Sequence, residues 1–369
     1  MMGRAIVIGA GVVGASVAYH LATAGMEVEI HEQGRPGGGT SGASLAWTNA
    51  VDRTPEHYFR LSQLAMAAHR SLQIEVGRTW QFGTGMLEFA EDDQEQHVLA
   101  ERMQRLRAWG YPVQRLSVEQ ACSVVEPNLT LDPARVPWVA AFPDDRWVQA
   151  TVMIGALLAA ARDAGARVHP NSPVTGISRT GGRATGVTLA SGEQIDAEVV
   201  VNCAGPWAAE VGAWFGVDLP MHQRPGLILV TQPAPTEVRG VIRAPGLEIR
   251  EDGGGRLLLN ALFAEDRLEG DTAPSIDAPV SREALARTRR LVRGLDGVDF
   301  EVSRRGRRPM PDDGRPLVGP VPGLDGAYVV VTHSGVSLAP LLGRMVANEI
   351  ARDTIQPELE ELRLDRSIG

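Results

Sequence analysis

The chain has 369 residues, of which 44% are hydrophobic and 22% are charged, a composition typical of a globular protein large enough for two domains. Its formal net charge of −9 argues against nucleic acid or an anionic membrane as the main partner. Two cysteines cannot build a disulfide framework, and no metal-ligand pattern or long apolar stretch is recognisable. We therefore expect no metal site, no membrane span and a cytoplasmic location.

Arginine supplies all of the 36 basic residues, and the chain contains no lysine. A GC-rich coding bias accounts for this preference without a functional cause. The chemical consequence is that no lysine can act as a Schiff-base nucleophile, a general base or an oxygen-activating cation.

The first thirty residues predict a βαβ unit. Residues Arg4–Ile8 form an apolar, β-branched run typical of a buried parallel strand. The run Val12–Ala24 has apolar residues at helical spacing, and Gly25 follows it where helices commonly end. Residues Glu27–His31 then alternate as a second strand.

A glycine-rich loop joins the first strand to the helix. It reads Gly9-Ala10-Gly11-Val12-Val13-Gly14, the G-x-G-x-x-G pattern in the context that dinucleotide binding requires. The first glycine permits a tight turn, the second lets the backbone approach a pyrophosphate, and the third lets the helix pack closely. Glu32 ends the second strand, where a carboxylate can accept hydrogen bonds from ribose hydroxyls. The loop alone leaves FAD and NAD as alternatives.

Further helices and strands enclose a strand-rich middle segment. We expect helices near residues 55–75, 97–109, 150–164, 281–292 and 338–350, and strands at 167–169, 198–202, 327–331 and throughout 226–263. Because helix-bearing α/β segments lie at both ends, we infer a discontinuous nucleotide-binding domain with an inserted substrate domain. The nucleotide domain is predicted over residues 1–55, 140–220 and 300–369, and the substrate domain over 56–139 and 221–299.

Four more motifs follow the glycine loop in a characteristic order. They are Gly37–Ala50 (GGGTSGASLAWTNA), Val201–Ala208 (VNCAGPWA), Arg308–Gly319 (RPMPDDGRPLVG) and Thr332–Pro340 (THSGVSLAP). With these motifs the chain resembles the D-amino-acid-oxidase-like (DAO) family of FAD-dependent oxidoreductases, which includes glycine oxidase, sarcosine oxidase and D-amino-acid dehydrogenases. The resemblance implies an α/β fold (α+β overall), with a Rossmann-type FAD-binding domain and an inserted, mostly antiparallel-sheet substrate domain.

The resemblance also implies which residues contact FAD. They are Gly9, Gly11, Val12, Val13, Gly14, Glu32, Gln33, Gly39, Thr40, Ser41, Ser44, Val174, Cys203, Ala204, Gly205, Trp207, Gly335, Val336, Ser337 and Leu338. Sarcosine oxidase carries a flavin-linking cysteine near the Arg308 motif, whereas this segment has none, so the resemblance implies noncovalent FAD. The sequence departs from the family pattern at Pro311-Asp312 and at Thr332.

Two residues are candidates for the substrate site. Arg308 matches the family's arginine before proline, and a guanidinium fork suits a substrate carboxylate. The alternative is a surface residue in the run Arg304, Arg305, Arg307 and Arg308, with Arg307 the next candidate for the clamp. His333 either lies near the flavin or is an ordinary turn residue.

The function implied is oxidation of the C–N bond of an amino acid or secondary amine. A hydride would pass to flavin N5, the imine would hydrolyse, and oxygen or another acceptor would take the electrons. One alternative is a dehydrogenase of the same fold that reduces a quinone or carrier protein. Another is a flavin-binding subunit of a larger complex. An NAD-dependent Rossmann enzyme is disfavoured by the later motifs. The oligomeric state is not predicted.

Overall fold

The computed structural model describes residues 3–367, and its first layer is a six-stranded sheet. The strand order is β19-β20-β13-β1-β2-β9. All neighbours are parallel except β19, which runs antiparallel to β20. The bounds are β1 Arg4–Ile8, β2 Glu27–His31, β9 Arg167–His169, β13 Val199–Asn202, β19 Leu317–Pro320 and β20 Ala327–Val331.

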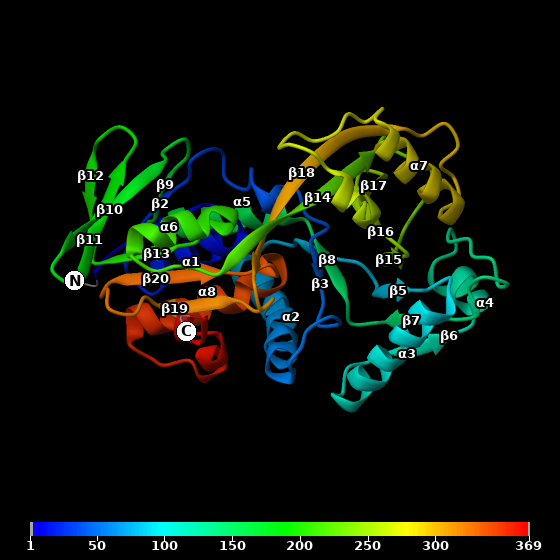
Figure 1. The fold of residues 1–369 in the computed structure, drawn as a ribbon, viewed down its shortest axis with the longest axis horizontal. Helices are drawn as coiled ribbons and strands as arrows, with labels where there is room; N and C mark the ends of the chain where they lie inside the picture. Colours follow the sequence, from blue (N-terminus) through cyan, green and yellow to red (C-terminus); the bar gives the residue numbers. More distant parts are fainter. Residues whose placement is uncertain (1–2, 368–369) are drawn as a thin grey trace.

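Both faces of this sheet are covered, as a parallel sheet requires. On one face lie four helices, α1 (Val12–Thr23), α2 (Glu56–Val76), α5 (Ala150–Asp163) and α8 (Gly335–Arg352). On the other lie α6 (Ala208–Phe215) and a small sheet of β10 (Val174–Thr180), β11 (Arg183–Leu189) and β12 (Gln194–Asp196). The doubly covered α/β layer confirms the Rossmann-type fold, and it forms the left half of Figure 1.

An eight-stranded, largely antiparallel sheet forms the right half of Figure 1. Its order is β18-β14-β17-β16-β15-β5-β7-β6, with only the β15–β5 pair parallel among the described residues. The bounds are β5 Met86–Glu88, β6 Gln114–Leu116, β7 Val139–Phe142, β14 Met221–Thr231, β15 Val241–Ala244, β16 Leu247–Gly253, β17 Arg256–Asn260 and β18 Phe300–Pro311. One face packs on α7 (Pro279–Leu291). The opposite face shares a core with α3 (Asp93–Ala108) and with residues 45–51.

Short elements connect the two layers. A three-stranded sheet joins β3 (Trp47–Thr48), β8 (Arg146–Val148) and β4 (Gln81–Phe82). The remaining short helices are η1 Thr40–Gly42, α4 Val118–Gln120, η2 Ala121–Val125, η3 Gly205–Trp207, η4 Leu262–Arg267, η5 Pro357–Leu362 and η6 Leu364–Ser367.

Two elements cross the predicted domain boundaries. Helix α2, predicted within the substrate segments, packs on the core of the six-stranded sheet. Strand β18, predicted within the nucleotide segments, is instead an edge of the eight-stranded sheet beside β14. The sequence pattern predicts that a segment is an amphipathic helix or a strand, but it does not predict which element this segment packs against. The division into domains stays a prediction.

The last helix begins earlier than expected. Helix α8 begins at Gly335 rather than at Leu338, so Pro340 lies inside the helix and not in its first turn. Proline has no N–H, so the carbonyl of Val336 loses its usual helical donor. The His69 side chain replaces that donor, with Nε2 2.9 Å from the Val336 oxygen. A tertiary contact therefore makes the interior proline tolerable.

Candidate functional site

A cavity of about 380 Å³ lies at the carboxyl ends of the parallel strands. Its walls include the residues directly after β1, β2, β13 and β20, namely Gly9, Glu32, Cys203 and Thr332. Ligands of open α/β sheets bind at this edge, because the loops after the strands converge there. The cavity also reaches the N-terminal turns of α1 and α8, whose free N–H groups favour anionic groups.

The glycine loop has the geometry that its sequence predicts. Gly9 has φ +99°, and a Cβ there would lie 2.7 Å from the Cys203 carbonyl oxygen. A Cβ on Gly14 would lie 1.9 Å from the Gly9 oxygen, so Gly14 allows α1 to approach β1. A Cβ on Gly11 would meet Ser41 Oγ at 3.2 Å, and this hydroxyl accepts a hydrogen bond from the Val12 amide. The loop after β2 thus completes the cradle formed by the glycine loop.

Backbone amides hold the Glu32 carboxylate in place. Its two oxygens accept hydrogen bonds from the amides of Ala10 and Gly34, each at 2.9 Å. These bonds fix both oxygens and leave each able to accept from another donor. The carboxylate lines the cavity, where it can bind ribose hydroxyls.

A second pocket of about 240 Å³ lies beside the first. Four residues line both cavities: Thr40, Ser44, His333 and Val336. The second pocket therefore joins the first at the N-terminal end of α8. A molecule in this pocket could contact a cofactor in the first cavity without leaving the protein.

One face of the eight-stranded sheet forms the floor of the second pocket. Residues opposite one another on neighbouring strands share a face, and the register places Ile228, Asn260, Glu248 and Arg243 in one row. All four line the pocket. Two residues before Ile228 in β14, Gly226 lies on the same face and also lines the pocket.

Arg308 lines this second pocket from β18. Its guanidinium forms an ion pair with the buried Glu265 and donates to the carbonyl of Pro225 at 2.7 Å. Its Nε is buried and has no hydrogen-bond partner among the described residues. Arg224 also pairs with Glu265, at 3.1 Å. Both contacts of the Arg308 guanidinium use Nη2, so Arg308 is a positioned cation with N–H donors that these two partners leave unused.

Arg307 lies on the other side of the strand. Its side chain forms an ion pair with Asp271 at 2.9 Å, and it lines neither cavity. Its carbonyl accepts a hydrogen bond from the Thr40 hydroxyl. Of the two candidate arginines, the structure brings only Arg308 to the pocket.

His333 lies where the two cavities meet. Burial lowers its pKa to about 3, and the charges of Arg53, Arg308 and Arg224 lower it in the same direction. The imidazole is therefore neutral at physiological pH. It can exchange hydrogen bonds with a ligand, but it is too weak a base to hold a proton from an ammonium group.

Comparisons with known proteins agree with this geometry. The family model described as "FAD dependent oxidoreductase" (DAO) matches residues 4–349. The chain belongs to this family. It is therefore an FAD-dependent oxidoreductase with the DAO fold, which confirms the resemblance seen in the sequence.

Individual relatives match the whole chain. A glycine oxidase of Geobacillus kaustophilus is 29% identical over 98% of this chain and 97% of the relative. A glycine oxidase of Pseudomonas aeruginosa is 27% identical over 94% of each chain. The crystal structure of the Geobacillus kaustophilus glycine oxidase superposes with a TM-score of 0.87 at 28% identity, covering 100% of both chains.

Most of the residues expected to contact FAD line the first cavity. They are Gly9, Gly11, Val12, Val13, Glu32, Gln33, Gly39, Thr40, Ser41, Ser44, Val174, Cys203, Ala204, Gly205, Trp207, Gly335 and Val336. Gly14, Ser337 and Leu338 do not. Gly14 serves helix packing, Ser337 lines the second pocket and donates to the Trp47 carbonyl, and Leu338 is fully buried in the core.

Sequence reasoning missed other wall residues. Gly34 and Arg35 directly follow Gln33, so extending the prediction by two positions would have found them, and Pro309 lies within the Arg308–Gly319 motif. Val211 and Trp214 lie on α6, which contacts the cavity only because of how it packs. No local pattern marks these two residues.

Cys203 lies buried in the wall of the first cavity. Burial raises the pKa of its thiol well above the usual value. The thiol therefore stays protonated and is a poor nucleophile. Cys203 is therefore a small buried residue of the cavity wall and not a redox-active thiol.

Sequence reasoning also missed a buried polar cluster beside the cavity. Glu29, His31 and His169 bring one potential ligand atom each within 4.8 Å of one another. The two imidazole rings are stacked, with planes 8° apart. Ring-nitrogen lone pairs lie in the ring plane, so nearly parallel rings do not direct them at one ion. Arg4 and Arg167 also pair with Glu29, so the cluster is held together by ion pairs.

None of the helices within residues 3–367 combines the length and the apolar character that a membrane crossing needs.

Proposed function

We propose that FAD occupies the first cavity and is bound noncovalently. The glycine loop and the N-terminus of α1 would hold the pyrophosphate, and Glu32 would bind the ribose. The loop around Ser41 and the start of α8 would contact the flavin end, next to the second pocket. Cys203 supports noncovalent binding, because its protonated thiol cannot readily attack the flavin.

We infer that the enzyme oxidises the C–N bond of an amino acid or secondary amine. Bound FAD supplies the chemistry by accepting a hydride from the carbon next to nitrogen. The observation that carries this proposal is the second pocket, which opens on the cofactor cavity and presents the cation of Arg308. Two of the matching relatives are glycine oxidases, whose substrate combines an amine with a carboxylate.

The residues of the pocket would bind and orient the substrate. Arg308 would pair with a carboxylate through N–H groups that Glu265 and Pro225 leave unused, while Glu265 holds the guanidinium in place. His333 stays neutral, so the amine has to arrive without its proton or lose it to solvent. Activity should therefore rise with pH as more of the free amine becomes available.

The electron acceptor that we propose is oxygen, as in an oxidase. A dehydrogenase that reduces a quinone or carrier protein is the alternative, and the absence of lysine favours it, because no lysine can activate oxygen. Stopped-flow mixing with substrate under nitrogen, followed by mixing with air, separates the two. Reoxidation by air within one turnover supports an oxidase. A flavin that stays reduced until a quinone is added would show a dehydrogenase, and failure of every amine to bleach the flavin would favour a subunit of a larger complex.

The noncovalent state has its own test. We expect acid or heat to release FAD into the supernatant of the precipitated protein. Flavin that stays with the polypeptide would contradict the proposal.

A further inference from the structure

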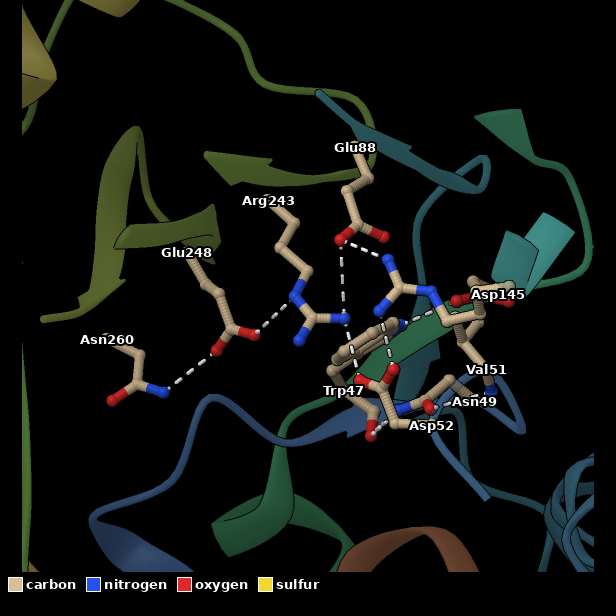
Figure 2. A network of polar contacts seen from close by, with 10 residues as sticks. Trp47, Asn49, Val51, Asp52, Glu88, Asp145, Arg243, Glu248 and Asn260 are labelled. Atoms are coloured by element: carbon tan, nitrogen blue, oxygen red, sulfur yellow. Dashed lines mark hydrogen bonds and ion pairs between the residues drawn. The ribbon is translucent and has the colours of Figure 1, made fainter. Parts of the chain in front are cut away.

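The floor of the second pocket contains a partly buried network of charged side chains. Arg243 contacts three carboxylates, those of Asp52 at 2.7 Å, Glu88 at 3.6 Å and Glu248 at 3.6 Å. Arg102 pairs with Asp52 and Glu88 as well. Figure 2 shows Arg243 between these carboxylates, with Asn260 beyond Glu248. The ion-paired network therefore joins three carboxylates to two guanidinium groups.

Glu248 is the carboxylate of this network whose closest ion pair with an arginine is the longest. Asp52 uses both oxygens in contacts of 2.7 Å, one to each arginine. Glu248 Oε2 accepts from Asn260 at 2.8 Å, whereas Oε1 lies 3.6 Å from Arg243 Nε, beyond a good hydrogen bond. Glu248 is only 6% exposed, yet it lines the pocket, which Glu88 does not. Burial raises the pKa of Glu248, as expected for a carboxylate without a full complement of donors.

The two ends of the pocket have opposite charge. At the His333 end, Arg53, Arg308 and Arg224 are close enough to lower the pKa of the imidazole. At the other end, the three carboxylates of Asp52, Glu88 and Glu248 outnumber the two guanidinium groups of Arg102 and Arg243, which leaves a net negative charge around Glu248. Strands β18 and β16 are separated by β14 and β17, and Arg308 lies opposite Arg224, four residues before Ile228 in the row of Glu248. Three strand spacings and this shift along the strands set the backbone positions of Arg308 and Glu248 roughly 20 Å apart, although both side chains line the same pocket. A ligand that contacts both has to be elongated.

We propose that Glu248 is a specificity-determining residue that binds a cationic group, an ammonium or guanidinium, at the far end of the substrate. The inference rests on the proposed amine oxidation. The carboxylate of the substrate lies at the arginine end, beside His333 and the cofactor cavity, and a basic side chain reaches Glu248. The preferred substrates are basic amino acids rather than glycine.

Flavin reduction in matched substrate pairs tests this inference. Lysine is compared with norleucine, and arginine with citrulline, using both enantiomers under nitrogen. We expect the cationic member of a pair to reduce the flavin about 10- to 100-fold more efficiently, the range for a hydrogen bond to a charged group. Glu248→Gln should bring this ratio close to one, because the efficiency of the cationic member of each pair falls toward that of its neutral partner. A wild-type ratio near one, or a ratio that survives in Glu248→Gln, overturns the inference.

Glu251→Gln is the matched control. It removes the same charge from the same strand, three residues further on, where alternation directs the side chain to the opposite face of the sheet. The substrate ratio should stay as in the wild type. An equal fall in both variants would show a general charge effect and overturn the assignment to Glu248.

A binding measurement separates this inference from the proposed function. 5-Aminopentanoate and pentanoate both have a carboxylate but no α-amine, so neither can undergo oxidation next to the carboxylate. Titration of the holoenzyme, followed by the visible flavin spectrum, should show tighter binding of 5-aminopentanoate, and Glu248→Gln should abolish the difference. If no amino acid reduces the flavin but this difference persists, the proposed reaction fails and the cation site stands. Equal binding of the two acids overturns the cation site.

Discussion

The two cavities differ in the kind of groups that form their walls. The first is formed by loops after parallel strands, and its polar contacts come mainly from the backbone and from small residues such as Gly11 and Ser41. The second lies on the antiparallel sheet, and long charged side chains from separate strands form its floor. Where the backbone makes the contacts, many side-chain substitutions leave the hydrogen bonds intact, but a larger side chain at a closely packed glycine blocks the ligand. A site built from side chains can change its ligand by changing a single residue.

The largest effect is expected where bulk enters the backbone-built cavity. In Gly11→Val, the branched side chain meets Ser41, which lies 3.2 Å from the first added carbon, and it occupies the space of the pyrophosphate. We expect folded protein with little FAD, measured as the flavin-to-protein absorbance ratio. Gly155→Val in α5 is the control, because no atom lies within 4 Å of its added Cβ. Full flavin occupancy in Gly11→Val would show that the phosphates bind elsewhere.

In the pocket built from side chains, Arg308→Ala should spare FAD and impair substrate use. Loss of a buried charge-assisted pair costs about 2–5 kcal/mol, or roughly 30- to several-thousand-fold in the efficiency of flavin reduction. The loss should be smaller for an amine without a carboxylate, and Arg308→Lys should recover only part of it.

Arg307→Ala provides the comparison for Arg308→Ala, because the Arg307 side chain lines neither cavity. It should leave the kinetics close to wild type. An equal loss on substrates with and without a carboxylate would move the clamp to another residue, and loss of FAD would assign Arg308 to the cofactor.

A smaller effect is expected where a side chain supports the backbone between the two cavities. His69→Leu removes the donor to the Val336 carbonyl and should reduce the free energy of unfolding by about 1–3 kcal/mol. Pro340→Ala restores a backbone N–H that can reach this carbonyl, so His69→Leu should cost less in that background. Urea denaturation of the two single variants and the double variant measures the coupling. An equal cost in both backgrounds would mean that the hydrogen bond does not compensate for the proline.

The smallest effect concerns the pH dependence of stability. Burial raises the pKa of Asp145 to about 8. The Asp145 carboxyl group is hydrogen-bonded to the side chains of Tyr111 and Trp47, and Trp47 lines the second pocket. The folded state then holds a proton that the unfolded state has released, so stability falls as pH rises from about 4 to about 8.

Asp145→Asn should remove this contribution, because an amide can replace the protonated carboxyl in both hydrogen bonds. The melting temperature of the variant, relative to wild type, should therefore increase between pH 6 and pH 9. The exposed neighbour Asp144 serves as the control, as Asp144→Asn. A constant difference across this range would show that Asp145 is ionised in the fold.

The sequence alone identified the βαβ unit, the glycine loop, Glu32 and the strands β2, β9 and β20 with their bounds. Each depends on residues close together in the chain, because the path of the loop and the alternation of the strands are local properties. The order of the family motifs added the fold and the cofactor, which the family match confirms.

Only the tertiary structure determined which residues form the second pocket and what charge they carry. The pairing of four strands in one register places Ile228, Asn260, Glu248 and Arg243 side by side in a row. These residues are neighbours in the sheet although up to 32 positions separate them in the sequence. The depressed pKa of His333 and the interior Pro340 likewise depend on distant groups, the three arginines and His69. Burial and long-range pairing set the charge and the shape of the second pocket, and no local pattern in the sequence encodes them.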